Sequence, residues 1–300
     1  MSTRTVFTVS ANGPFDRDAV VANLSSHAVS GLQHFDAEPR VLSRWIEVAG
    51  TQQFVQVQLV DAHLVVTTDS MDPGINDAIA QRVRFWFDLD TDLAPVNAHL
   101  AQDPLFAPQV SQRPGIRITR HHAPFEGTIM AVLGQQVTLA TGRLFAARLV
   151  DAYGIMPTGK IPSWATLAQD LRIFPSAHAI ANAPVQELRA ALKLTNARAR
   201  TVSEVAKLFA DHGAHAEHET FPNREELAAV YGIGPWTLDV LAIRATADKD
   251  AFPASDAVLR RMMAAVEPGL GEDKKKDATR SARWRPYRSY AAQRLWAMLN

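Results

Sequence analysis

The sequence contains no cysteine. The chain can therefore form no disulfide bond and can offer no thiolate ligand to zinc or to an iron–sulfur cluster. It also lacks a run of about 18 apolar residues, the length that a helix needs to cross a bilayer. Its first fifteen residues, MSTRTVFTVSANGPF, lack the continuous apolar segment of a secretory signal. We therefore expect a cytoplasmic protein without membrane association.

A net charge is absent as well, since 31 Lys and Arg balance 31 Asp and Glu. The charges are nevertheless unevenly distributed along the chain. Residues 1–111 hold 6 basic and 13 acidic side chains, whereas residues 112–300 hold 25 and 18. Opposite signs in the two parts favour two domains, with a polyanion as partner of the second. Ordinary scatter of surface charge gives the same pattern, so charge alone does not assign the partner.

The first part, residues 1–111, predicts an α+β domain. Alternating apolar and polar residues indicate strands in TVFTVSA, VLSRWIEVAG, QFVQVQLVDA and HLVVTTD. Helical spacing of apolar residues occurs in FDRDAVVANLSSHAV, DPGINDAIAQRVRFWFDLD and LAPVNAHLAQ. We expect a mixed domain of an antiparallel sheet plus helices. The proline-containing stretch FAPQVSQRPGIRITRHHAP is the best candidate for a linker to the next domain.

The second part, residues 112–300, predicts an all-α domain of eight to ten helices. A long helical pattern in FEGTIMAVLGQQVTLATGRLFAARLVDAYG is interrupted near Gly134. Further helical segments follow at short intervals, and no strand pattern competes with them. The lysine-rich stretch GEDKKKDATRSARWRP is expected to be a solvated loop or a helix end.

The stretch YGIGPWT, residues 231–237, predicts a tight turn between two helices. Gly232 and Gly234 allow backbone angles that other residues avoid, and Pro235 suits the first position of a helix. The N–H groups of Ile233, Gly234 and the next helical turn would then point outward and bind an anion such as phosphate. Taken alone, a glycine-rich turn without a ligand is the simpler interpretation.

Four ordered motifs resemble one family. LAAVYGIGPWTLDVLAIRA resembles the hairpin of the helix–hairpin–helix DNA glycosylase superfamily, and AFPASDAVLRRM places Asp256 twenty residues after Trp236. FEGTIMAVLGQQVTLATGRL and RWRPYRSYAAQRLW are similar to one branch, the bacterial 3-methyladenine DNA glycosylase II enzymes. The resemblance covers about residues 112–299 and implies an all-α glycosylase domain at 112–300. It also implies an acidic α+β domain before it, here residues 1–111.

The resemblance gives Asp256 the catalytic role. Cleavage of an N-glycosidic bond leaves positive charge on the sugar, and a carboxylate beside C1′ can stabilise that charge and orient or deprotonate the attacking water. Alkylated purines are already cationic and leave easily, so one carboxylate can suffice. Without the resemblance, Asp256 is more simply a helix N-cap before AVLRRMM.

Trp236 decides which kind of glycosylase the resemblance implies. Relatives that also nick DNA carry a lysine at this place, which forms a Schiff base with the sugar. Tryptophan offers no such amine, so we expect a monofunctional enzyme without lyase activity. The resemblance also implies a base pocket walled by Trp236, Trp296 and Phe125. A core tryptophan is the alternative for Trp236, and Val240 stands where the best-known relative has a pocket aromatic.

The remaining implied contacts are with DNA. Gln136, with its neighbour Gln135, would enter the duplex as a wedge in place of the extruded nucleotide, although the familiar relative uses an apolar residue there. An exposed polar helix break is the alternative. Phosphate would be held by Gly232, Ile233, Gly234 and Thr237. A monovalent cation, Na⁺ or K⁺, would lie on the backbone carbonyls of Ala228, Val230 and Ile233.

These observations predict a monofunctional DNA glycosylase that flips alkylated purines out of duplex DNA and hydrolyses their glycosidic bond during base excision repair. No cofactor beyond the structural cation is expected. The partner would be double-stranded DNA with alkylated bases, and the enzyme a monomer in the bacterial cytosol. Two alternatives stay open: a glycosylase for an oxidised or deaminated base, and a helix–hairpin–helix protein that binds DNA without catalysis.

Overall fold

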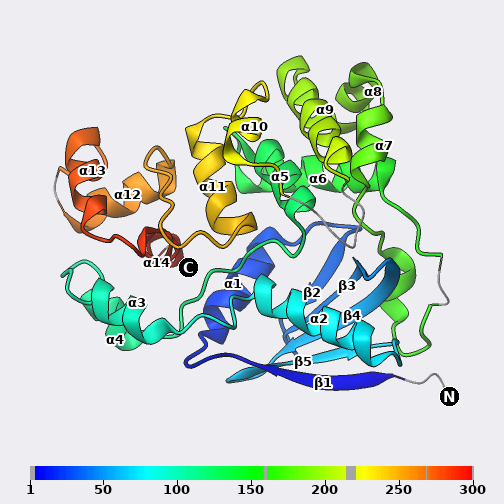
Figure 1. Ribbon diagram of the computed structural model, residues 1–300, viewed down its shortest axis with the longest axis horizontal. Coiled ribbons are helices and arrows are strands. Elements are labelled where there is room, and N and C mark those ends of the chain that lie inside the picture. Colours follow the sequence, from blue (N-terminus) through cyan, green and yellow to red (C-terminus); the bar gives the residue numbers. More distant parts are fainter. Residues whose placement is uncertain (1–3, 159–160, 214–220, 268, 299–300) are drawn as a thin grey trace.

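The computed structural model describes residues 4–158, 161–213, 221–267 and 269–298 (Figure 1). Five strands form one antiparallel sheet in the order β1-β5-β4-β3-β2. Their bounds are β1 Thr5–Ser10, β2 Gln33–Asp36, β3 Val41–Val48, β4 Thr51–Leu59 and β5 His63–Thr68. The expected antiparallel sheet is therefore confirmed. β2 was not foreseen, because four residues of an edge strand are too short to show an alternation.

Side-chain alternation in β3 and β4 gives the sheet two apolar faces. Leu42 and Ile46 of β3 point to the face covered by α1 (Arg17–His27) and α2 (Pro73–Trp86). Trp45 of β3 and Phe54 of β4 point to the other face, where the short 3₁₀ helix η1 (Thr166–Asp170) covers them. The Trp45 indole N–H donates to the Ala168 carbonyl at 2.8 Å. A segment from the second part of the sequence therefore completes the core of the first.

Ten α-helices, α5 to α14, follow residue 123 in the described part of the chain, so the all-α prediction is confirmed. Their bounds are α5 Pro124–Gly134, α6 Leu139–Tyr153, α7 Ala177–Asn182, α8 Val185–Leu192, α9 Asn196–Asp211, α10 Arg224–Ala229, α11 Pro235–Ala245, α12 Ala257–Val266, α13 Lys274–Ala282 and α14 Arg288–Ala297. The expected break lies between α5 and α6. The central helix is α5, which packs against α6, α9 and α11.

The lysine-rich stretch forms the helix α13. Asp273 caps it by accepting from the backbone N–H groups of Lys275 and Lys276 at 2.8 and 3.3 Å. Asp277, which is buried, accepts from the Gly271 N–H at 2.7 Å. α13 is held by these polar contacts and shows only a weak apolar periodicity. The sequence pattern therefore did not reveal it as a helix.

The helices α3 (Leu93–Leu100) and α4 (Ala107–Gln112) lie beside the C-terminal helices, at the left of Figure 1. Leu93, Val96 and Phe106 share one apolar cluster with Leu259 of α12 and Leu295 of α14. We call this cluster the C-terminal core. Residues 93–112 therefore pack with the C-terminal helices, although the sequence groups most of them with the N-terminal domain. The chain therefore begins to pack with the C-terminal helices before residue 111, the last residue that the sequence assigns to the N-terminal domain.

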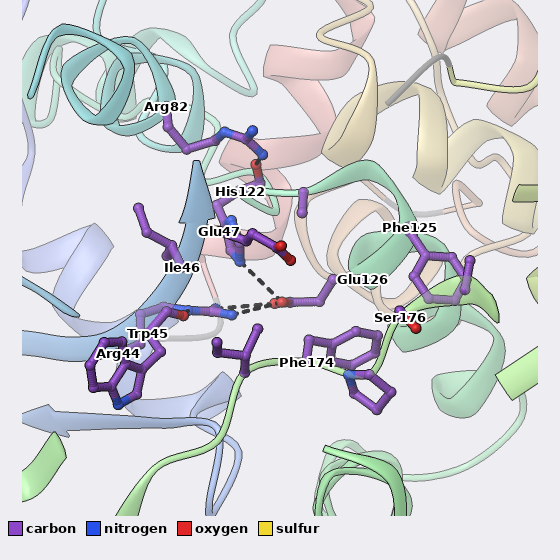
Figure 2. A pocket seen from close by; sticks show the side chains of 14 residues that line it. Arg44, Trp45, Ile46, Glu47, Arg82, His122, Phe125, Glu126, Phe174 and Ser176 are labelled. Atoms are coloured by element: carbon purple, nitrogen blue, oxygen red, sulfur yellow. Dashed lines mark hydrogen bonds and ion pairs between the residues drawn. The ribbon is translucent and has the colours of Figure 1, made fainter. Parts of the chain in front are cut away.

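A buried ionic cluster fixes the sheet to the central helix (Figure 2). Arg44 of β3 donates to both carboxylate oxygens of Glu126 of α5, at 3.1 and 2.7 Å. His122 Nε2 lies 3.1 Å from the same carboxylate, and all three side chains are buried. The nearby Arg44, above all other charges, holds the pKa of Glu126 well below its usual range despite burial. The pair joins the two parts of the chain as a clamp.

No helix in the described ranges is long and apolar enough to cross a membrane.

Candidate active site

Asp256 is the N-cap of α12, and its carboxylate accepts four N–H groups. Its Oδ1 accepts from the backbone of Val258 and Leu259, both at 3.0 Å. The indole N–H of Trp236 donates to Oδ2 at 2.9 Å, and that of Trp296 donates to Oδ1 at 3.3 Å. The residue is thus a helix cap, as its local sequence suggests, and also the meeting point of two tryptophans.

Three helices bring these residues together. Trp236 is the second residue of α11, directly after Pro235, and Trp296 lies near the end of α14. All three side chains are partly exposed. Three residues that the sequence assigned to one site, spaced over sixty positions, therefore share one hydrogen-bonded centre.

The hydrogen bonds leave the two carboxylate oxygens unequal. Oδ1 accepts three N–H groups, whereas Oδ2 accepts one. Since a carboxylate offers about four acceptor positions on two oxygens, Oδ2 keeps room for a further partner. All four donors are electrically neutral, so they orient the carboxylate without cancelling its charge. Such a group can stabilise a positive centre or accept a proton from water.

The hairpin between α10 and α11 is built around Gly232. This residue has φ 84°, and a Cβ there would come within 2.5 Å of the Thr201 hydroxyl oxygen on α9. Gly234, in contrast, faces open space and is the N-cap of α11. The two glycines thus serve different purposes: one permits the turn against α9, and the other leaves the helix N-terminus uncovered.

The expected anion site is smaller than the sequence suggested. Ile233 is buried, and its N–H donates to the Val230 carbonyl at 3.1 Å, which corrects the expectation that this group points outward. The N–H groups of Gly234, Trp236 and Thr237 donate to no acceptor within the described residues. These three groups lie at the positive end of the α11 dipole and can receive a phosphate oxygen.

Gln135 joins the α5–α6 turn to this hairpin. Its side-chain amide donates to the Gly232 carbonyl at 2.9 Å and to the Thr237 hydroxyl at 2.8 Å. Thr237 is only 2% exposed, so its side chain supports the hairpin from inside, and a phosphate contact of that hydroxyl is not supported. Arg198 of α9 also donates to the Gln135 carbonyl. These bonds engage both the side-chain amide and the backbone carbonyl of Gln135. Gln135 is therefore a positioning residue, which corrects its assignment to the wedge.

Gln136 differs from its neighbour in each of these respects. It is exposed, and its φ of 52° lies in the left-handed region that non-glycine residues avoid. No hydrogen bond to the hairpin is formed by its side chain within the described residues, in contrast to Gln135. A strained, exposed residue next to Gln135, which contacts the hairpin, is well placed for contact with a ligand.

Two family models cover most of the chain. The model described as "AlkA N-terminal domain" matches residues 6–123, and the model described as "HhH-GPD superfamily base excision DNA repair protein" matches residues 129–289. The chain belongs to the HhH-GPD superfamily. The hairpin with Gly232 and the aspartate at position 256 both lie inside the second match.

Individual relatives agree with this HhH-GPD assignment. The chain is 33% identical over 291 residues to a Mycobacterium tuberculosis protein named "Probable bifunctional transcriptional activator/DNA repair enzyme AlkA", which covers 95% of this chain and 55% of the relative. This chain therefore spans about half the length of that relative. A Bacillus subtilis protein named "DNA-3-methyladenine glycosylase" is 26% identical over 277 residues, with 88% of each chain covered.

Among solved structures, the "3-methyladenine dna-glycosylase from Archaeoglobus fulgidus" has the same fold. Its TM-score is 0.77 at 18% identity, with 96% of each chain covered. At that identity the likeness concerns the fold alone, including the sheet domain that precedes the HhH-GPD helices.

Arg244 is a site residue that sequence reasoning missed. Its guanidinium carbon lies over the Trp296 ring, 4.8 Å from the ring centroid. The N–H at the edge of the same indole donates to Asp256. Arg244 also donates to the Thr119 carbonyl. Arg244 follows Trp236 by eight residues on α11, a spacing that places both on one side of a helix. That spacing is the signal that could have revealed it.

Phe125 lies in a different place from the one expected. It is 4% exposed in the core of the helical domain, where its ring meets those of Phe174 and Phe209 at 6.0 and 5.2 Å between centroids. It also lines the cavity beside Arg44 and Glu126 in Figure 2. The described contacts do not connect Phe125 with Asp256 or the two tryptophans, so its assignment to the base pocket is corrected.

Proposed function

We propose that this protein is a monofunctional DNA glycosylase that removes alkylated purines, such as 3-methyladenine and 7-methylguanine, from duplex DNA. The observation that carries this proposal is the Asp256 carboxylate, oriented by two indole N–H groups and partly exposed beside them. A negative charge next to aromatic faces suits a cationic, planar base and the positive sugar that its departure leaves. The relatives named for 3-methyladenine support this substrate class.

The reaction would proceed in two bond changes. The glycosidic bond breaks with its electron pair going to the base, so a cationic alkylpurine leaves as a neutral molecule and the positive charge moves to C1′. Asp256 Oδ2, which keeps an acceptor position, stabilises that charge. Water then adds to C1′, and its proton passes to the carboxylate and on to solvent. The products are a free base and an abasic site.

The strand itself would stay intact. Cutting at the abasic site by β-elimination begins with an amine that forms a Schiff base at C1′. Trp236 occupies the place of that lysine, and its indole nitrogen donates to Asp256. Since an indole nitrogen is no nucleophilic amine, this residue supports glycosylase activity without lyase activity.

A monomer of this chain would bind DNA at the hairpin. The N–H groups of Gly234 and Trp236 would bind a backbone phosphate, while exposed Gln136 would enter the duplex where the damaged nucleotide leaves it. The Ala228 carbonyl lies at the end of α10, where the last carbonyls of a helix lack intrahelical donors, and the Val230 carbonyl accepts the Ile233 N–H with one of its two lone pairs. Together with the Ile233 carbonyl they would hold a monovalent cation, which would add positive charge beside the phosphate.

The first experiment measures base release from alkylated duplex DNA by the wild type and by Asp256→Asn, with no alkali added. Asparagine keeps an oxygen for the α12 cap but carries no charge, so we expect release to fall by roughly 10²–10⁴-fold with the fold preserved. Strands should remain uncut until alkali is added. Equal release by both proteins would assign the chemistry to another residue. DNA binding without release by the wild type would favour a binding protein or another lesion.

A second experiment separates the two glutamines. Gln136→Ala should slow excision from duplex DNA much more than from single strands, because only the duplex has a gap to fill. Gln135→Met removes the amide that holds Gly232 and Thr237, so it should weaken binding to an undamaged duplex as well. If Gln136→Ala and Gln135→Met changed excision and binding in the same way, the two glutamines would not have separate roles.

A further inference from the structure

We infer that Arg244 is a specificity-determining residue: it covers one face of Trp296 with a positive charge and thereby reduces the preference of the site for cationic over neutral bases. The inference rests on the proposed function, because it concerns which flipped bases the same site accepts. It concerns a residue that forms no hydrogen bond to Asp256.

The position of Trp296 is fixed at two points. Its indole edge donates to Asp256 at 3.3 Å, and the guanidinium carbon of Arg244 lies 4.8 Å from its ring centroid. Arg244 is itself held by the segment that precedes α5, since its side chain donates to the Thr119 carbonyl and its own carbonyl accepts from the His121 N–H at 2.9 Å. With one face covered in this way, a base can stack only on the opposite face of Trp296.

The charge on Arg244 is not neutralised by a contact ion pair. No carboxylate of the described residues forms an ion pair with it, and Asp256 is the acid that acts on it through space. Burial, reinforced by the nearby Arg120, lowers the pKa of Arg244 to about 10. The side chain therefore stays protonated near neutral pH, and its positive charge lies directly behind the ring that would meet the base.

This charge acts differently on the two classes of base. A cation draws electron density of the indole toward itself, so a second cation on the opposite face is held less tightly and is also repelled. A neutral base meets no such penalty. When it departs it carries away the electron pair of the broken bond and becomes negative, which a nearby cation favours. A cationic alkylpurine leaves as a neutral molecule and gains nothing from that cation.

The test compares two single-lesion duplexes, one with 7-methylguanine as the cationic base and one with hypoxanthine as the neutral base. Single-turnover rates are measured for the wild type, Arg244→Gln and Arg244→Lys. Glutamine removes the charge and keeps a planar amide, so the 7-methylguanine to hypoxanthine rate ratio should rise roughly three- to tenfold, as expected for one screened charge across a ring. Lysine keeps the positive charge but loses the planar stack, so its ratio should stay nearer to that of the wild type than the Arg244→Gln ratio does.

Arg200→Gln is the matched control, because Arg200 stacks on Tyr231 of the hairpin at a similar distance, 4.7 Å. It should change both rates by one factor and leave their ratio unaltered. Melting temperatures verify that each variant remains folded.

The outcomes separate the two proposals. Release of neither base by the wild type would refute the proposed function. An unchanged ratio in Arg244→Gln, an equal rise in the lysine variant, or a wild type that releases 7-methylguanine but no hypoxanthine would each overturn the inference about Arg244 while leaving the glycosylase proposal intact.

Discussion

Glu126 and Asp256 are both carboxylates that accept several hydrogen bonds, yet they belong to different regions with different tasks. Glu126 is 4% exposed at the junction of sheet and helices, and its partners are the Arg44 guanidinium and a histidine. Asp256 is partly exposed at the start of α12, and its four partners are neutral N–H groups.

The difference lies in the charge of the donors. A guanidinium that binds both oxygens cancels the charge of Glu126, which makes the pair a clamp between two parts of the fold. Neutral donors fix the direction of the Asp256 carboxylate and leave its charge available to a positive centre. A count of hydrogen bonds would not separate the two residues, whereas the charge of the donors and the access of solvent do.

The largest effect is expected from Glu126→Gln. The substitution leaves Arg44 buried without a counter-charge, so the free energy of unfolding should fall by about 3–5 kcal/mol. Chemical denaturation measures this change. Base release per folded molecule should remain near that of the wild type, since Glu126 lies outside the Asp256 centre. If Glu126→Gln were stable but released base poorly, Glu126 would belong to the catalytic site, and the contrast with Asp256 would be wrong.

The second effect is a dependence of stability on pH. Burial, reinforced by Arg44, lowers the pKa of His122 to about 4 from its usual 6.5. Between these values the unfolded chain binds a proton that the folded chain does not, so stability falls as pH drops from 6.5 toward 4. At pH 5 the loss from this residue is about 2 kcal/mol. Glu126 contributes only at lower pH, because its stabilisation is lost below its ordinary pKa.

Denaturation curves at pH 7 and pH 5 test this for the wild type and for His122→Gln, in which an amide can still donate to Glu126. The variant should lose less stability than the wild type over this interval. Identical slopes would show that His122 does not titrate on unfolding in this range.

A smaller effect on stability is expected at Asp256. Asp256→Ala removes the acceptor for Val258 and Leu259 and should cost about 1 kcal/mol, as for other N-caps. Asp256→Asn keeps that acceptor and should cost less. Thermal unfolding of both variants, beside Glu126→Gln, measures the contrast. A loss at Asp256 as large as that at Glu126 would mean that both carboxylates are structural.

The smallest effect should come from Trp236→Phe. Phenylalanine keeps an aromatic ring but deletes the N–H that orients Asp256 Oδ2. One hydrogen bond to a charged group is worth roughly 1.5–3 kcal/mol, but three other donors still hold this carboxylate. We therefore expect a loss of about fivefold in the single-turnover rate with binding unchanged. An unchanged rate would mean that the Trp236 N–H is not needed to orient the Asp256 carboxylate.

Much of the site was predictable because its residues lie in recognisable motifs. Asp256, Trp236 and Trp296 lie in motifs that resemble those of the glycosylase superfamily, and this resemblance assigned all three to one site. Local patterns alone predict only a helix N-cap at Asp256 and a glycine–proline turn before Trp236. Gln135 and Arg244 were not predictable in their roles. Their partners, Gly232 and Trp296, lie far away in sequence, and only packing reveals which neighbour a polar side chain meets.

The fold shows the same limit. Helices with an apolar face and strands with alternation were recognised, whereas the short edge strand β2 and the polar helix α13 were not. Phe125 was misplaced because its motif indicates a helix but not which core that helix enters. The packing of α3 with α12 and α14 depends on contacts between residues far apart in sequence, which no local pattern encodes.

That packing also sets the order in which the protein can mature during synthesis. The apolar faces of α3 and α4 leave the ribosome early, but their partners Leu259 and Leu295 are made much later. Until then Leu93 and Phe106 have only part of their core, and a nascent chain that stops before α14 also lacks Trp296. The chain must therefore keep these early helices from aggregating through most of its translation, and the centre around Asp256 is among the last parts to form.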